Sequence, residues 1–135
     1  MPVSRISFQV PSHTGNYGDT GPPVTGFLHE MRWNPSGGTT DTGVVVTLTI
    51  LGKDKQSGDT GAGFVFWQNS GVNTKLASNF IECPRQPVTY GTTDNSGDSC
   101  FEPYLLSHQR IRLRATNDTG TGQFVGTWWF TFYEQ

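Results

Sequence analysis

The sequence predicts an all-β protein, a single antiparallel β-sandwich or jelly-roll-like domain with long loops rich in Gly, Thr and Asn. Short segments alternate apolar with polar residues, which is typical of strands that bury one face. Clusters of Gly, Asn, Asp, Ser and Pro separate these segments, and such residues favour turns. With 15% charged residues, 17 Gly and 8 Pro, the composition disfavours helices.

One domain over residues 1–135 fits the length of the chain, because domains of roughly 100 to 200 residues bury a core of their own. Aromatic residues make up 13% of the chain, which argues against disorder. No helical periodicity extends far enough to predict a helix. The chain is therefore expected to fold as one compact unit.

The expected strands follow the alternation along the chain. Three segments show it best, and their inward residues are predicted to be Ile6, Phe8 and Val10, then Val44, Val46, Leu48 and Ile50, then Ile111, Leu113 and Ala115. Further strands are expected over residues 25–33, 63–68, 74–82, 88–90 and 123–133, giving about eight in all.

Two long loops are expected, an extended N-terminal loop over residues 11–23 and a second loop after Leu51. Surface loops of more than about 12 residues are uncommon unless they have a role. Both loops are therefore interpreted as contact elements.

The C-terminal strand carries aromatic residues on both of its predicted faces. Trp128, Phe130 and Phe132 are expected in the core, and Thr127, Trp129, Thr131 and Tyr133 on a half-polar outer face. A hairpin between residues 110–116 and 123–133 would place an arginine row beside that face. The candidate protein-interaction surface is therefore Trp129, Tyr133, Thr127, Thr131, Arg110, Arg112 and Arg114.

Several functions compete for this surface. A protein partner ranks first, because Trp, Tyr and Arg are enriched at interfaces. A sugar stacked on Trp129 and single-stranded nucleic acid are alternatives, but a net charge of −2 disfavours nucleic acid. The simplest alternative is that arginine stems pack over the rings and close a solvent-facing sheet.

No enzyme is predicted. Asp-Thr-Gly, the signature of aspartic proteases, begins at Asp19, Asp41, Asp59 and Asp118. All four copies lie in turn-rich segments, and a polar stretch precedes Asp59 where a hydrophobic strand is needed, so Asx turns explain them better. The segment "DNSGDS" departs from the calcium-loop pattern, and the histidines lack metal-ligand spacing. No catalytic, cofactor-binding or metal-binding residue is predicted.

The cysteines and the N-terminus bear on localisation. Cys83 and Cys100 are expected to be free thiols in preference to one disulfide across the intervening loop. The start "MPVSRISFQV" does not have the pattern of a secretion signal, and no segment approaches the length of a membrane span. Synthesis in the cytoplasm and no membrane partner are therefore expected.

The order of these signals resembles a known group. The segments that carry the resemblance are "MRWNP" (31–35), "DTGVVVTLTIL" (41–51), "CPRQPVTYGT" (83–92), "QRIRLRAT" (109–116) and "GTWWFTFYE" (126–134). In this arrangement the chain is similar to small β-sandwich proteins encoded among the head and structural genes of tailed bacteriophages. The similarity covers about the last hundred residues. The loops at residues 11–23 and 69–74 are longer than in that group.

This resemblance implies a virion structural protein, a capsid decoration or cement protein that binds the major capsid protein of a phage head. It also implies a homo-oligomer, a trimer or dimer, assembled in the host cytoplasm and located on the capsid surface. The alternative is a carbohydrate- or receptor-binding domain of a tail fibre or spike that uses Trp129, Tyr133 and nearby arginines.

Overall fold

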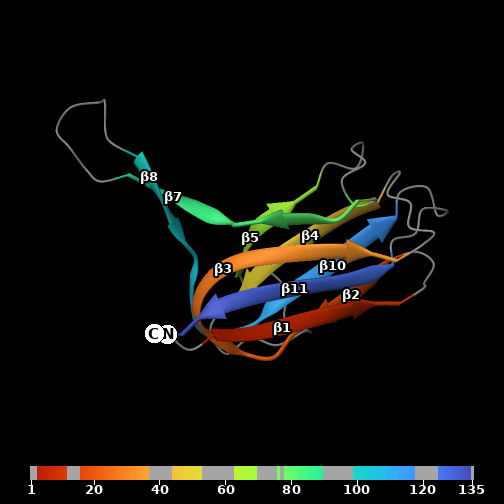
Figure 1. The fold of residues 1–135 in the computed structure, drawn as a ribbon, viewed down its shortest axis with the longest axis horizontal. Coiled ribbons are helices and arrows are strands. Elements are labelled where there is room, and N and C mark those ends of the chain that lie inside the picture. Colours follow the sequence, from red (N-terminus) through yellow and green to blue (C-terminus); the bar gives the residue numbers. More distant parts are fainter. Residues whose placement is uncertain are drawn as a thin grey trace.

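A computed structural model describes residues 3–11, 16–36, 44–52, 63–69, 76, 78–89, 99–117 and 125–134. These residues form strands and no α-helix, which confirms the all-β prediction (Figure 1). The strands are β1 (Val3–Val10), β2 (Tyr17–Thr20), β3 (Val24–Pro35), β4 (Val44–Leu51), β5 (Gly63–Gln68), β6 (Phe80–Glu82), β7 (Arg85–Thr89), β8 (Ser99–Pro103), β9 (Leu105–Gln109), β10 (Ile111–Asn117) and β11 (Gly126–Tyr133).

Two antiparallel sheets pack face to face. Sheet A has the order β1-β11-β3-β6, with β9 also paired to β3, and sheet B has the order β2-β10-β4-β5. The chain passes from one sheet to the other at most of its connections, which gives the two-sheet jelly-roll arrangement. Strands that follow each other in sequence, such as β10 and β11, therefore lie in different sheets.

One position at the edge of sheet A is shared by two short strands. β6 pairs with β3 over Met31–Trp33, and β9 pairs with β3 over Val24–Phe27. The chain between β6 and β9 forms the two-stranded ribbon β7–β8, which projects away from both sheets (Figure 1). We call this ribbon the β-arm.

The inner faces of the two sheets form one hydrophobic core, as the alternation predicts. Trp128, Phe130 and Phe132 are fully buried. Trp128 lies opposite Trp33, with ring centroids 4.8 Å apart, and the Trp33 indole N–H donates to the Leu76 carbonyl at 2.7 Å. The residues predicted to face inward in β4 and β10 are also buried, as are Phe8 and Val10 of β1, whereas Ile6 is partly buried against the core.

β3 changes the phase of its alternation at a β-bulge. Thr131 of β11 lies opposite Glu30, but the next residue, Phe132, lies opposite Leu28, so His29 is the additional residue. Consequently Leu28 faces the core before the bulge and Met31 faces it afterwards. The bulge keeps this strand of 12 residues packed on one core along its whole length.

Two predicted segments were wrong, and two strands were not predicted. Residues 11–23 were expected to be a loop, but they contain β2, which pairs with β10. In the expected strand 74–82, only Phe80–Glu82 is a strand within the described residues. β8 and β9 were missed because consecutive apolar or polar residues interrupt their alternation. The loop expected after Leu51 and the segment 70–74 fall outside the described residues.

Gly26 is required where β3 passes the end of β11. Its φ is +149°, and a Cβ at this position would lie 2.7 Å from the Tyr133 carbonyl oxygen. We predict that Gly26→Ala lowers the free energy of unfolding by about 1–3 kcal/mol, because the strained backbone and the clash occur together.

Gly18 supplies the matched control, because the nearest atom to a Cβ there is the Leu113 carbonyl oxygen at 3.7 Å. Gly18→Ala should leave the stability close to that of the parent protein. Chemical denaturation of the two variants measures the difference, and equal stabilities would contradict this explanation of Gly26.

Candidate interaction surfaces

The predicted hairpin between residues 110–116 and 123–133 is wrong. β10 pairs with β2 and β4 in sheet B, whereas β11 pairs with β1 and β3 in sheet A. Arg112 and Arg114 therefore lie on the outer face of sheet B, away from Trp129. Arg110 lies between β9 and β10, where its guanidinium donates to the Gly21 carbonyl at 3.1 Å. The structure does not bring the seven predicted residues together.

Trp129 nevertheless lies beside arginines, which are different ones from those predicted. On the outer face of sheet A, Trp129 lies opposite Arg32 of β3 and Ser7 of β1. Thr131, two residues along β11, lies opposite Arg5 and Glu30. These neighbours could not be predicted from the sequence, because they come from strands that are distant along the chain.

These residues line a shallow hollow, which we call the Trp129 hollow. It has a volume of about 150 Å³ and is lined by Arg5, Glu30, Arg32, Trp129 and Thr131. Arg32 approaches Glu30 at 3.9 Å, and about half of the Arg32 side chain is exposed. An exposed ion pair of this length contributes little to stability. The hollow therefore offers an aromatic ring, two guanidinium groups and one carboxylate to a ligand or partner.

The outer face of sheet B is more polar. Arg112 and Arg114 line a hollow together with Gly18 and Thr20 of β2. Burial, and then the positive charge of Arg114, lowers the pKa of the Arg112 guanidinium. Burial, and then the nearby Asp19 carboxylate, raises the pKa of the Tyr17 phenol. This face carries no exposed aromatic ring among its described residues.

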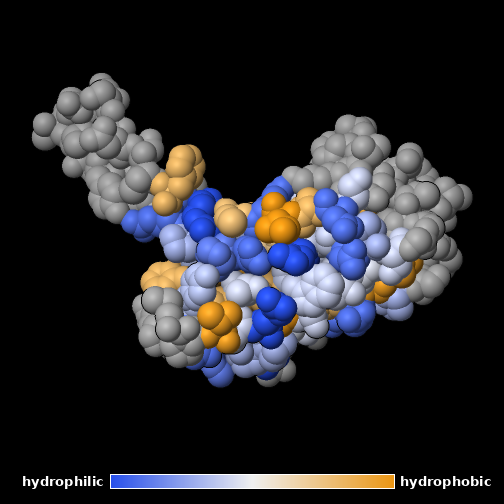
Figure 2. All heavy atoms as spheres, viewed as in Figure 1, coloured by the Kyte–Doolittle hydropathy of each residue, from blue (hydrophilic) through white to orange (hydrophobic). Residues whose placement is uncertain are grey.

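A second feature of sheet A went unrecognised in the sequence. Val3, Tyr133, Phe27 and Leu105 lie opposite one another across β1, β11, β3 and β9 on the outer face. We call these four residues the apolar row. Val3 is 55% exposed and Leu105 46% exposed. Figure 2 shows apolar and charged residues interspersed over this face of the molecule.

The β-arm begins beside the bulge of β3 and is fixed there by hydrogen bonds. The Arg85 guanidinium donates to the carbonyl oxygens of His29 at 3.1 Å and Pro84 at 2.8 Å. On the returning strand, the Leu28 N–H donates to the Tyr104 carbonyl at 2.8 Å. Both ends of the arm are therefore attached to β3, which gives the arm a defined direction.

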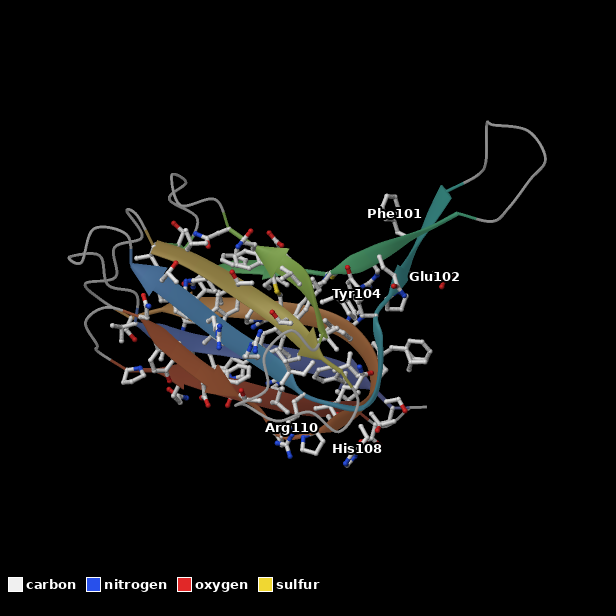
Figure 3. The ribbon with its side chains drawn as sticks, turned by 180° about the vertical axis from the view of Figure 1, so that it is seen from behind. Phe101, Glu102, Tyr104, His108 and Arg110 are labelled. Carbon is white, nitrogen blue, oxygen red and sulfur yellow. The ribbon has the colours of Figure 1, made fainter. Side chains whose placement is uncertain are left out.

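The β-arm presents an exposed aromatic side chain. Phe101 of β8 is 68% exposed, more than any other large hydrophobic side chain in the described part of the chain. Figure 3 shows Phe101 standing off the ribbon, whereas Tyr104 lies at the base of the arm. Tyr104 packs against Phe64 and Phe66 of β5, with ring centroids 5.5 and 5.8 Å apart. The base is thus part of the sandwich, and the rest of the arm projects beyond it.

The register of the arm separates the two cysteines. Cys100 lies opposite Val88, which is five residues beyond Cys83. At about 3.3 Å per residue their Cα atoms lie roughly 16 Å apart along the ribbon, whereas a disulfide requires about 4–7 Å. Cys83 is an exposed free thiol, as expected for this residue.

The described residues contain no group of three or more His, Cys, Asp or Glu side chains placed to hold a metal ion. The same residues include no helix with the length and apolar character that crossing a membrane requires. Of the four Asp-Thr-Gly segments only Asp19–Gly21 is described, and there the Asp19 carboxylate accepts the Thr20 N–H at 2.8 Å.

Comparisons with protein-family models, with curated proteins and with solved structures gave no match. The fold and the surfaces described above therefore carry the functional argument by themselves.

The hydrogen bonds of Arg85 are expected to stabilise the root of the arm against local opening. Arg85→Gln removes a charged donor, so we expect the root of the arm to open more readily, by about 1–3 kcal/mol, which corresponds to at least several-fold faster amide exchange. Hydrogen exchange of peptides covering residues 84–104 measures the effect. Arg114→Gln is the control, because Arg114 is exposed and lies in β10 of the other sheet. Equal exchange in both variants would contradict the anchoring role.

The raised pKa of Tyr17 leads us to expect a loss of stability at alkaline pH. Its folded pKa is raised above the ordinary 10.0, so the folded state favours the neutral phenol. The resulting contribution to stability is present below pH 10 and disappears as the pH rises through the folded pKa. Tyr17→Phe should lower the free energy of unfolding near neutral pH, because it deletes the hydrogen bond from the Tyr17 hydroxyl to the Gln9 carbonyl. As the pH rises above 10, the variant should lose less stability than the parent protein. Denaturation between pH 8 and 11 tests this, and a constant difference would contradict it.

Proposed function

We propose that this protein is a structural subunit of a tailed-phage particle, a capsid decoration protein that binds the major capsid protein on the surface of the head. It acts by protein–protein contact and not as an enzyme, and it needs no cofactor. It is assembled in the host cytoplasm together with the head.

The β-arm is the observation that carries this proposal. A decoration protein binds through many copies of one modest interface, so a docking element held in place before binding reduces the entropy lost on association. Arg85 and the Leu28–Tyr104 bond hold the arm in this way. Phe101 provides an exposed aromatic anchor of the kind found at the centres of protein interfaces.

The jelly-roll fold is compatible with two classes of function, because it occurs in viral capsid proteins and in lectins. The second candidate, a carbohydrate- or receptor-binding domain of a tail fibre or spike, depends on the Trp129 hollow. Its ring, guanidinium groups and carboxylate suit a sugar. The Trp129 hollow, at about 150 Å³, is smaller than the roughly 300–1,000 Å³ of typical ligand pockets, whereas an adjoining hollow of about 470 Å³, also lined by Arg32 and Trp129, is within that range. We rank protein contact first because of the exposed Phe101 on the β-arm.

The test uses expanded empty heads assembled from the major capsid protein of the phage that encodes this chain. The purified protein should co-sediment with the heads at a fixed ratio and raise their melting temperature. Trp129→Ala should bind the heads as the parent protein does, because the arm makes the contact.

A glycan array supplies the opposite outcome. If the protein fails to bind heads but is retained on glycans, and Trp129→Ala abolishes that retention, the decoration proposal is wrong and the receptor-binding function replaces it.

A further inference from the structure

We infer that the outer face of sheet A carries a binding groove for a short acidic oligosaccharide. The Trp129 ring is its stacking surface, and the Arg5 guanidinium is the partner of a carboxylate on the sugar. The inference extends the sugar site of the second candidate function to a longer groove and names its ligand class. It does not depend on head binding, which the β-arm carries.

Two adjoining hollows form the groove. The Trp129 hollow contains Arg5 of β1, and the adjoining hollow, of about 470 Å³, reaches Ile81 of β6. Trp129 and Arg32 line both hollows, so the two are continuous around these side chains. The groove therefore crosses β1, β11, β3 and β6, four strands that at about 4.8 Å per spacing span roughly 14 Å. This length accommodates more than one sugar ring.

The Trp129 ring lies at the middle of this face. Its register neighbours are Ser7 of β1 and Arg32 of β3, and Ile81 of β6 lies opposite Arg32. The indole is half-buried, so the sheet holds it while part of its surface stays exposed. A tryptophan held in this way offers a large apolar surface at a low cost in side-chain entropy. The C–H face of a sugar ring can stack on it.

The polar side chains of the groove determine what a ligand must supply. Arg5 and Arg32 only donate hydrogen bonds and need acceptors, whereas the Glu30 carboxylate only accepts and needs a donor. The amides of Asn34 and Asn79, in the adjoining hollow, do both. Sugar hydroxyls donate and accept, so they satisfy all of these groups. Single-stranded nucleic acid also stacks on aromatic rings, but its phosphates offer no donor to Glu30.

The charge of the groove favours an acidic sugar. Its two guanidinium groups and one carboxylate make it locally positive, on a chain whose net charge is −2. Glu30 lies 3.9 Å from Arg32 and offsets the charge of that residue. Arg5 is exposed and forms no hydrogen bond or ion pair with another residue in the described part of the chain. A guanidinium donates two parallel hydrogen bonds to a carboxylate, so Arg5 is the group that selects an acidic sugar.

The first experiment compares acidic glycans with their neutral counterparts. The array carries sialylated and uronate-containing oligosaccharides beside the same chains without the carboxylate. The protein should be retained on acidic members and about ten-fold less on their neutral counterparts, because these lack the charge-assisted pair. Equal retention on the two sets, or no retention on any member, would overturn the inference.

Variants separate stacking from charge. Calorimetry uses the acidic oligosaccharide that the array retains best, together with its neutral counterpart. Trp129→Ala should weaken the binding of both by about ten-fold or more, because it removes the stacking surface. Arg5→Gln should weaken only the acidic one, by about ten-fold. Arg114→Gln is the matched control, because Arg114 is exposed on sheet B, and it should change neither affinity. Equal weakening of both ligands by Arg5→Gln would contradict the role of Arg5.

Two other ligand classes are outcomes of the same assay. Poly-glutamate presents carboxylates without a sugar ring, and oligothymidylate presents phosphates with bases that stack. Neither should displace the oligosaccharide at an equal concentration of charged groups. Displacement by poly-glutamate would identify the groove as a site for acidic peptides, and displacement by oligothymidylate as a site for single-stranded nucleic acid. Either result would overturn the inference.

Phe101→Ala separates this inference from the proposed function. The substitution removes the exposed ring of the β-arm, so it should reduce head binding and leave the affinity for the oligosaccharide unchanged. Trp129→Ala should have the opposite effects. Thermal unfolding establishes that each variant folds. If Trp129→Ala does not fold, Arg5→Gln decides the inference, because Arg5 is exposed and its substitution leaves the core intact. Either proposal can therefore fail without the other.

Discussion

The edge of β3 opposite β11 is the constraint on which the rest of the structure depends. An unpaired edge of a sheet exposes backbone donors and acceptors, which must be paired, covered or solvated. Here β6 pairs with one end of that edge and β9 with the other. Between them, at the bulge, the Arg85 guanidinium and the Tyr104 carbonyl satisfy the groups of His29 and Leu28. The chain can leave the sandwich at this point and return without exposing the strand.

The same bulge organises the outer face of sheet A. Because His29 is an additional residue in β3, Phe27 before it and Glu30 after it both point outward. Phe27 thereby aligns with Tyr133 in the apolar row, and Glu30 aligns with Thr131 in the Trp129 hollow. His29 itself packs on Tyr133, with ring centroids 4.5 Å apart. One inserted residue thus separates an apolar stripe from a charged hollow on one sheet.

Much of the fold could be predicted from the sequence because the core strands alternate clearly. In β11 the prediction that Trp128, Phe130 and Phe132 face the core, on the opposite side of the strand from Trp129, was correct. Period-two alternation is a local property of the backbone, so it can be predicted from the sequence. The partners of Trp129 could not be predicted in the same way. The hairpin hypothesis assumed that neighbours in sequence are neighbours in a sheet, and in a jelly roll they are not. Arg32 and Arg5 therefore replace the expected Arg112 and Arg114.

The position of the β-arm bears on how such a protein can change over time. The arm leaves and rejoins the sandwich at adjacent points of one strand edge, so the core strands keep their register whatever the ribbon contains. A hairpin inserted in this way can be lengthened at its tip at little entropic cost to the domain. Its sequence can also diverge while the residues at its root, Arg85 and Tyr104, stay the same. The sandwich and the projecting ribbon are then free to evolve at different rates.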